Sequence, residues 1–383
     1  MDLDFTEEQD MLRNLVRSLV DDVAPLTVVR ELEDDPVGYS TALWDQLAEL
    51  DLIGLTLPEV YGGSGMSMIE GAVVYEELGR GLAPTPHFVS AVLGAGVLLR
   101  LGTDEQRAAI LPGVAKGETI LTPAWLEPDN SFAAKGVQVR AVADGDGFVI
   151  DGVKRHVAFA SSASKLVVLA RTGDGETDIG VFLVDRDADG VSLEQSFTIA
   201  SDTQYEVTFT GVRVGPDAVL GGATAATVGW HAWVDTMLDG IILLAAYAVG
   251  GAQFTLEITT QYAKDREQFD KPLGAFQAIS HYLADAKTAI DGATLLAREA
   301  AWARSESRDV SRLAPMAKLF AGQTFRDTTA MAQQVFGGVG FTLEYDVQLY
   351  FRRAKQLQLS WWDDRELEAR IAASVLDGEP APA

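Results

Sequence analysis

Two short stretches in the last third of the chain carry residue types that could hold a phosphate-bearing cofactor. The first runs from Arg266 to Ile279 and reads Arg-Glu-Gln-Phe-Asp-Lys-Pro-Leu-Gly-Ala-Phe-Gln-Ala-Ile. The second runs from Gln334 to Phe341 and reads Gln-Val-Phe-Gly-Gly-Val-Gly-Phe. An arginine fork matches a pair of phosphate oxygens, and glycines let a phosphate approach backbone N–H groups. The two stretches therefore indicate a diphosphate site between helices.

Each of these residues also has a purely structural explanation. An arginine after a helix is favoured by the helix dipole, and a solitary Gly-Gly is usually a helix C-cap. The Arg-x-x-Phe spacing followed by Phe-Gln-Ala-Ile favours the cofactor interpretation, with Phe269 on the adenine or ribose and Gln277, one turn into the next helix, on the diphosphate or ribose. The predicted cofactor residues are Arg266, Phe269, Gln277, Gln334, Val335, Gly337 and Gly338.

These stretches resemble the two C-terminal FAD-contacting elements of the acyl-CoA dehydrogenase family. A loop near the N-terminus, Pro58-x-x-Tyr61-Gly62-Gly63, has the form found in that family's first domain. The resemblance covers essentially the whole chain. It implies FAD as cofactor, an acyl-CoA thioester as substrate and electron-transferring flavoprotein as the usual electron acceptor. In the family, both elements reach across a subunit interface to the adenosine-diphosphate half of a neighbour's FAD.

The order of sequence patterns agrees with this resemblance. Helical periodicity dominates to about residue 120, short β-rich runs punctuated by Gly and Asp follow to about 222, and long helical patterns return. We expect an acyl-CoA dehydrogenase-like fold with an N-terminal all-α domain (1–120), a middle β-barrel or sandwich domain (121–222) and a C-terminal four-helix-bundle domain (223–383). The β-rich runs are Gly147 to Val153, Leu166 to Ala170, Gly180 to Val184, Tyr205 to Phe209 and Val212 to Val214.

The expected chemistry removes an α proton from the thioester while a hydride leaves the β carbon for the flavin, so the protein must supply a base. The family places this glutamate in one of two positions. The first is the loop before the last helix, where the family often reads Tyr-Glu-Gly-Thr. Here the loop reads Ser360-Trp361-Trp362-Asp363, with tryptophan at the glutamate position. Asp363 and Asp364 follow, and they are typical of an N-cap and first helical turn.

The second family position lies at the start of the first long C-terminal helix, and it aligns with Gly240. Asp239 is adjacent, although one residue turns a helix by roughly 100 degrees. Asp239 is therefore the weak catalytic candidate of this chain, and it requires an irregular helix start. A solvated or capping aspartate is the alternative explanation.

The part of the sequence that should face the chain's own flavin also departs from the family. Thr-Glu-Pro-x-Ala-Gly-Ser appears as Leu126-Glu127-Pro128-Asp129-Asn130-Ser131. Ala158 replaces the threonine whose hydroxyl addresses the flavin ring, and His156 stands where an aromatic residue usually covers it. Asp270 replaces a glycine and brings a carboxylate toward the expected diphosphate.

Composition excludes several other classes of function. The chain has no cysteine, so disulfides, thiolate metal sites and cysteine nucleophiles are ruled out, and its four histidines show no metal-ligand spacing. A net charge of −26 argues against nucleic-acid binding. An acidic N-terminus and an apolar run of only Ile241 to Ala248 predict neither export nor a membrane span, so we expect a cytoplasmic protein.

The pattern of kept and lost motifs suggests a division of labour. What the chain would give to a neighbour's FAD is largely kept, while what it would give to its own flavin and thioester is eroded. This is expected of the partner subunit in a heteromeric α2β2 acyl-CoA dehydrogenase, a type associated with β-oxidation of CoA-linked steroid side chains in actinobacteria. The alternatives are a homotetrameric dehydrogenase with Asp239 as base, a flavin oxidase on the same fold, and a non-catalytic structural subunit with a vestigial flavin site.

Overall fold

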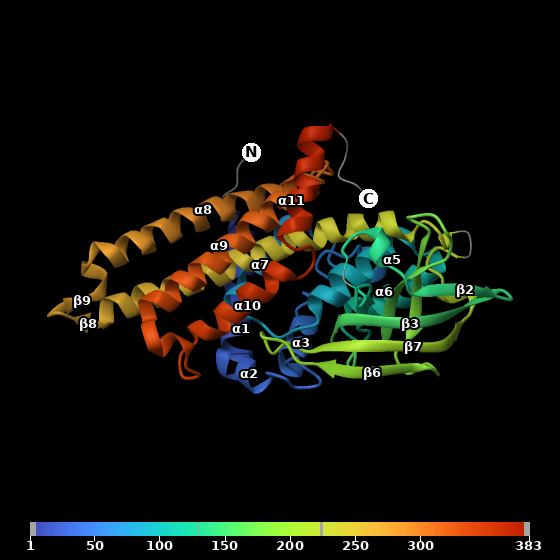
Figure 1. Ribbon diagram of the computed structural model, residues 1–383, viewed down its shortest axis with the longest axis horizontal. Coiled ribbons are helices and arrows are strands. Elements are labelled where there is room, and N and C mark those ends of the chain that lie inside the picture. The colour runs from blue at the N-terminus through green and yellow to red at the C-terminus, as the bar shows by residue number, and fades with distance from the viewer. Residues whose placement is uncertain (1–4, 130, 223–224, 379–383) are drawn as a thin grey trace. The chain divides into compact units, whose positions relative to one another are not determined.

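The computed structural model describes residues 5–129, 131–222 and 225–378 (Figure 1). Its chain forms two compact units. Unit 1 contains the chain up to Val29, Ser67–Ala83 and the residues from Ile241 onward, and unit 2 contains Arg30–Met66 and Pro84–Gly240. Asn130, which belongs to one of the motifs above, lies outside the described residues.

The N-terminal part of the chain is helical. Its helices are α1 (Glu7–Val23), α2 (Leu26–Glu31), α3 (Thr41–Glu49), η1 (Glu59–Tyr61), α4 (Met68–Arg80), the π-helix η2 (Phe88–Gly94), α5 (Ala95–Leu101) and α6 (Asp104–Ala115). Three of them begin with a complete capping box, built on Thr6, Ser67 and Thr103. In each box a hydroxyl and a Glu or Gln side chain satisfy backbone N–H groups that the first helical turn leaves unbonded.

The middle of the chain forms one seven-stranded sheet in unit 2. The strands are β1 (Leu121–Ala124), β2 (Arg140–Asp144), β3 (Gly147–Ala158), β4 (Lys165–Arg171), β5 (Ile179–Asp185), β6 (Val191–Ser196) and β7 (Gln204–Val214). Their order is β1-β4-β2-β3-β7-β6, and β5 pairs with β4. Leu166 through Ala170 of β4 are fully buried. The short 3-10 turns η3 (Ala134–Gly136) and η4 (Pro216–Ala218) flank these strands.

The C-terminal part is helical again, with a small hairpin between its first two helices. The elements are α7 (Gly229–Asp265), β8 (Glu267–Gln268), β9 (Lys271–Pro272), η6 (Leu273–Ala275), α8 (Gln277–Ser305), α9 (Leu313–Phe336), η7 (Gly337–Phe341), α10 (Val347–Leu359), α11 (Asp364–Ala372) and the π-helix η8 (Ala373–Asp377). In unit 1, α8 and α9 run side by side and the β8–β9 hairpin projects from one end of the bundle (Figure 1).

Two glycines allow α4 and α7 to approach each other closely in unit 1. A Cβ on Gly250 would lie 1.7 Å from the carbonyl oxygen of Glu76, and one on Gly79 would lie 2.0 Å from that of Tyr247. Because a real Cβ cannot occupy either place, these two positions require glycine. The contact is reinforced where the Tyr350 hydroxyl of α10 donates a hydrogen bond of 2.5 Å to the carbonyl of Arg80.

The predicted order of helical, β and helical segments is confirmed, but several element predictions were incomplete. Strands β1, β2 and β6 were not predicted, and the two runs from Tyr205 to Phe209 and from Val212 to Val214 form the single strand β7. Within the predicted N-terminal helical region, Phe88–Gly94 forms a π-helix. Gln277 is the first residue of α8 rather than one turn into it, and Arg266 directly follows α7. The bounds of the three domains remain predictions.

Helix α7 is more extended and more apolar than the run from Ile241 to Ala248 suggests. Its 37 residues include an 18-residue window with a mean hydropathy of 1.6, which is long and apolar enough to cross a membrane. However, 78% of that window is buried inside the protein. Burial of this kind is what a core helix shows, and it explains the hydropathy without a bilayer.

The buried histidine of unit 2 predicts how stability should depend on pH. His87 is 6% exposed, and its Nε2 lies 3.1 Å from the carbonyl oxygen of Leu52, to which it donates. Burial lowers the pKa of His87 to about 4, from an ordinary value of 6.5. Between these two pH values the unfolded chain binds a proton that the folded chain does not, so stability falls as pH falls.

We expect the unfolding free energy to drop by roughly 3 kcal/mol between pH 6.5 and pH 4 through this group alone, since one pKa unit corresponds to about 1.4 kcal/mol. Urea titrations of the wild type and His87→Gln across this range would measure it. The slope of stability against pH should be shallower in the variant, and equal slopes would contradict the assignment.

Candidate functional site

One aromatic stack in unit 1 brings the two predicted cofactor stretches together. The ring of Tyr262, one turn before Arg266, lies on that of Phe336 with centroids 4.2 Å apart and planes at 16°. Phe336 ends α9 and directly precedes Gly337. A small core of Ala332, Phe336 and Val347 supports the stack. The end of α7 and the end of α9 are therefore fixed side by side, as a shared binding site requires.

The first stretch folds into the exposed β8–β9 hairpin. Its two turn residues, Phe269 and Asp270, both have positive φ angles, 53° and 63°. This is the geometry of a type I′ turn, which Asn-Gly fits best. Phe269 is 85% exposed. The N–H of Leu273 closes the hairpin with a bond of 2.8 Å to the carbonyl of Arg266.

Arg266 is exposed on this hairpin, and no described residue hydrogen-bonds or ion-pairs with its guanidinium. All five donors are thus available to a phosphate. Asp270, two residues after Gln268, stands at a position where the family has glycine. The positive φ of Asp270 explains why only a few residue types fit there. Of the residues with a side chain, aspartate and asparagine tolerate the left-handed region best.

The second stretch provides open backbone. Gly337 has a φ of 65°, and a Cβ on either Gly337 or Gly338 would meet no other atom within 4 Å. The glycines are therefore exposed and unshielded by neighbouring atoms, which is the condition for a phosphate to reach the backbone N–H groups. Gln277 and Gln334 are exposed as well, whereas Val335 is 5% exposed and packs inward. These observations fit a diphosphate-bearing group.

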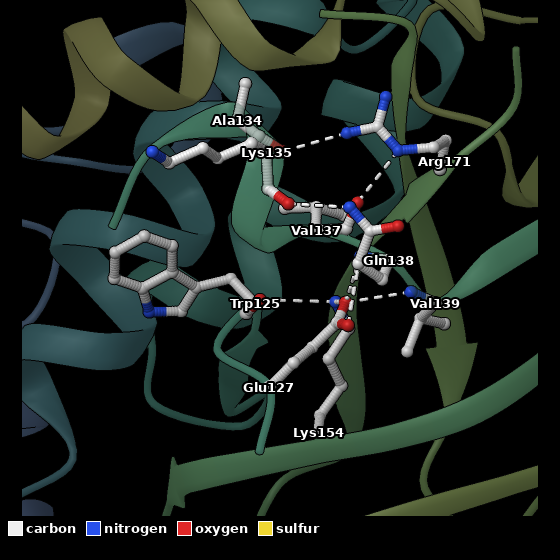
Figure 2. A network of polar contacts seen from close by, with 9 residues as sticks. All are labelled: Trp125, Glu127, Ala134, Lys135, Val137, Gln138, Val139, Lys154 and Arg171. Carbon is white, nitrogen blue, oxygen red and sulfur yellow. Dashed lines mark hydrogen bonds and ion pairs between the residues drawn. The ribbon is translucent and has the colours of Figure 1, made fainter. Parts of the chain in front are cut away.

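A buried ion pair in unit 2 joins Glu127 of the Leu-Glu-Pro motif to Lys154 of strand β3 (Figure 2). The carboxylate of Glu127 accepts a bond of 2.7 Å from Nζ of Lys154, and bonds of 2.9 Å from the backbone N–H groups of Gln138 and Val139. Lys154 is fully buried and also donates to the carbonyl of Trp125 at 3.2 Å. Burial lowers the pKa of Lys154 to about 8, while Glu127 opposes that shift.

Arg171, the last residue of β4, continues this network. Its guanidinium donates to the carbonyls of Val137 and Ala134, both at 2.9 Å (Figure 2). Lys154 and Arg171 therefore both hold the segment between β1 and β2, and this segment contains the Leu-Glu-Pro motif. The sequence showed Glu127 and Lys154 as parts of two motifs but gave no sign that they pair.

His156 occupies an unusual backbone position in β3. Its φ is 56°, at an irregularity in the pairing of β3 with β7. The amide of Gln204 donates to Asp202 at 2.6 Å, so its oxygen is the atom 2.8 Å from Nδ1 of His156. Nδ1 therefore carries a hydrogen and donates it to Gln204, while the His156 side chain is exposed. Ala158, two residues on, offers no hydroxyl.

The candidate base Asp239 lies in the interior of α7, because the helix begins ten residues earlier than its sequence position suggested. The irregular helix start that a catalytic Asp239 requires is therefore absent. Its carboxylate accepts a bond of 2.6 Å from Arg100 of α5, which also binds Asp235 at 2.6 Å. The carboxylate of Asp239 is thus engaged in an ion pair within unit 2, and its catalytic use stays a prediction.

Gly240, which aligns with the family glutamate, is packed against η2. A Cβ there would lie 2.9 Å from Cδ2 of Leu93 and 3.3 Å from the ring of Phe88. At the other family position, Asp363 is the N-cap of α11 and accepts from the N–H of Glu366 at 3.0 Å, as predicted. Trp361 and Trp362 precede it with φ angles of 53° and 67°.

Comparisons with known proteins agree with this architecture. Residues 6–118, 123–212 and 227–360 match the models of the N-terminal, middle and C-terminal domains of acyl-CoA dehydrogenases. A probable acyl-CoA dehydrogenase of Bacillus subtilis, YngJ, is 33% identical over 368 residues, which span 94% of this chain and 95% of the relative. The chain belongs to the acyl-CoA dehydrogenase family. It is thus an oxidoreductase that acts on CH–CH bonds, in a family that binds FAD.

Two solved structures are also similar. A chain of the ChsE4–ChsE5 complex from Mycobacterium tuberculosis has a TM-score of 0.88 and 28% identity, with all of both chains covered. A chain of a variant of the Tcur3481–Tcur3483 steroid ACAD has a TM-score of 0.86 and 33% identity, covering 97% of this chain and 98% of that one. The fold is therefore the acyl-CoA dehydrogenase fold, with helical, β and helical domains.

The Glu127–Lys154 pair predicts a large cost for removing its negative charge. Glu127→Gln leaves a buried ammonium without its counter-ion, and we expect a loss of roughly 3–5 kcal/mol in unfolding free energy. Urea denaturation would measure it. Glu206→Gln is the matched control, because Glu206 pairs with Arg155 at the surface of the same sheet and should cost less than about 1 kcal/mol. Similar losses in both variants would contradict this account.

The position of Asp270 in the hairpin turn predicts how its charge affects the affinity for FAD. Asp270→Asn keeps a residue that tolerates positive φ but removes the charge, so FAD should bind about fivefold more tightly, the effect of roughly 1 kcal/mol between close charges in water. Asp270→Gly should show the same gain. Fluorescence titration of FAD at low salt would measure both. Equal affinity of the wild type and Asp270→Asn would show that the carboxylate does not face the diphosphate.

Proposed function

We propose that this chain is the partner subunit of a heteromeric α2β2 acyl-CoA dehydrogenase, and that it helps to hold FAD whose thioester chemistry belongs to the other chain. The observation that carries the proposal is an asymmetry between two sets of residues. Arg266, Gly337 and Gly338 are open and available. The family's two base positions carry Gly240 and Trp361 instead of a carboxylate.

The available residues define what the chain would do for the bound cofactor. When bound, the flavin accepts the hydride that leaves the β carbon of the acyl group. Arg266 would neutralise the diphosphate, and the backbone N–H groups around Gly337 and Gly338 would bond its oxygens. Phe269 would lie against the adenine or ribose, and Gln277 and Gln334 would supply amide hydrogen bonds. None of these groups moves a proton, so their contribution is binding and orientation.

The residues near the family's base positions have structural partners instead. A base must be free to approach the α carbon and must gain a proton during turnover. The carboxylate of Asp239 is held by Arg100 at 2.6 Å, and that of Asp363 caps a helix. Leu93 and Phe88 crowd the position of Gly240. These contacts support a catalytic glutamate on the other subunit.

The similar structures support a proposal for the substrate. We infer that the complex dehydrogenates the CoA thioester of a steroid side chain, because one similar structure is described as a steroid ACAD and another is the ChsE4–ChsE5 complex. Electrons would pass to an electron-transferring flavoprotein. A homotetramer with Asp239 as base would require the Arg100 ion pair to break, and a non-catalytic structural subunit would leave Arg266 without a function.

Purification of this chain alone and together with the acyl-CoA dehydrogenase-like product of an adjacent gene tests the proposal. FAD should appear only in the co-purified complex, at one flavin for every two chains, and with acyl-CoA turnover. A single chain that is yellow and active would overturn it. A complex without flavin would favour the non-catalytic structural subunit.

Two variants in the complex separate cofactor binding from catalysis. Arg266→Ala removes charged hydrogen bonds to the diphosphate and should weaken FAD binding at least about tenfold, measured by flavin release on dilution. Asp239→Ala should leave kcat within about twofold when corrected for flavin content. Loss of turnover in Asp239→Ala with full flavin content and an unchanged fold would instead identify Asp239 as the base.

A further inference from the structure

The segment Ser360–Trp362 contains a backbone conformation that side chains seldom adopt. Trp361 and Trp362 are consecutive residues in the left-handed region, with φ angles of 53° and 67°. Each such residue costs roughly 1–2 kcal/mol relative to its preferred conformation. Strain of this kind persists only where surrounding contacts enforce it.

The enforcing contact is a buried ammonium group on α9. Lys318 is 3% exposed. Its Nζ donates to three backbone carbonyls, those of Leu357 at 3.1 Å, Ser360 at 2.9 Å and Trp362 at 2.7 Å. An ammonium has three hydrogens to donate, and here all three have acceptors in one short segment. The first acceptor belongs to the last turn of α10, where a positive charge also offsets the helix dipole.

Burying the ammonium group of Lys318 costs free energy of desolvation, so its hydrogen bonds must offset that cost. The structure shows no carboxylate within ion-pairing distance of Lys318 among the residues it describes, and burial lowers the pKa of Lys318 to about 7. The charges of Asp363 and Asp364 partly oppose that shift. A methionine would fill a similar volume without the desolvation of a charge. The three carbonyl bonds are therefore the reason for a lysine at this place.

The residues that follow Trp361 are fixed by further contacts. The ring of Trp362 is fully buried, and the guanidinium carbon of Arg370 lies 3.7 Å from its centroid. Asp363 caps α11, and Asp364 accepts a bond of 2.6 Å from the side-chain amide of Gln358. Trp361 itself is half-buried. Ser360 and Trp361 are therefore the residues of the segment that retain some exposure, whereas Trp362 is buried.

We propose that Lys318 is a positioning residue that locks Ser360–Trp362, so that Trp361 forms a fixed aromatic wall at the position that aligns with the family's base. This proposal rests on the proposed function, in which the catalytic base lies on the other subunit and not at this position. In this chain the segment is a permanent wall instead of a catalytic loop. The side chain of Trp361 sets the shape of this surface, and the amine of Lys318 sets where the side chain points.

The position of the Trp361 indole can be followed directly. The full chain labelled with 5-fluorotryptophan contains seven tryptophans, and Trp361→Phe assigns the ¹⁹F resonance of Trp361. In Lys318→Met that resonance should shift or broaden, and the amides of residues 360–362 should exchange about tenfold faster, as local opening becomes easier. The matched control Lys116→Met replaces an exposed lysine and should change neither. An unchanged resonance and unchanged exchange in Lys318→Met would overturn the proposal.

A second comparison does not require Lys318→Met to fold. Trp361→Gly and Trp361→Ala both remove the indole and differ in the cost of a positive φ. In the presence of Lys318, the glycine variant should have an equilibrium constant for unfolding about fivefold smaller than the alanine variant. Where Lys318→Met folds, this ratio should approach one in that background. Equal stability of the two variants beside Lys318 would show that no left-handed conformation is imposed.

Both measurements use the chain without flavin or a partner subunit. Their outcome is therefore distinct from that of the co-purification, which tests where the cofactor binds.

Discussion

The backbone contact between α4 and α7 is the constraint on which unit 1 depends. Gly79 and Gly250 bring two helices so close that no side chain fits between them. Glu76 is 6% exposed beside this contact, and its pKa is raised by burial, with Arg298 of α8 opposing the shift. The long bundle is thus assembled around α7, and the end of α7 carries the hairpin that presents Arg266. A methyl group at either glycine would displace that helix and the cofactor residues with it.

Much of the fold and part of the site could be predicted from the sequence. Capping boxes, helical periodicity and the Arg-x-x-Phe and Gly-Gly motifs are local signals. Such signals can be recognised in the sequence without knowing how the elements pack. Asp363 was correctly predicted as an N-cap for this reason. Strand β1 has only four residues, all of them buried, so it shows no period-two pattern, and its pairing partner β4 begins only at Lys165.

The remaining features arise from tertiary contacts that the sequence does not display. The pairing of Glu127 with Lys154, the three carbonyl bonds of Lys318 and the ion pair of Asp239 join residues from different elements. Buried charges are expensive, so each of them must have partners, but the identity of the partner depends on the fold. Asp239 shows the consequence. Its position beside the family glutamate suggested chemistry, while its contact with Arg100 indicates a structural ion pair.

The exposed hairpin also bears on how the protein is made in the cell. Phe269 is 85% exposed, and Phe341 and Leu343, in and after η7, are 67% and 72% exposed. Exposed apolar side chains are features that chaperones recognise in unassembled subunits. In the proposed heteromer, the other subunit would cover such side chains, and a chain made in excess of it would leave them exposed. Matched synthesis of the two proposed subunits would then limit the amount of chain that displays this apolar surface.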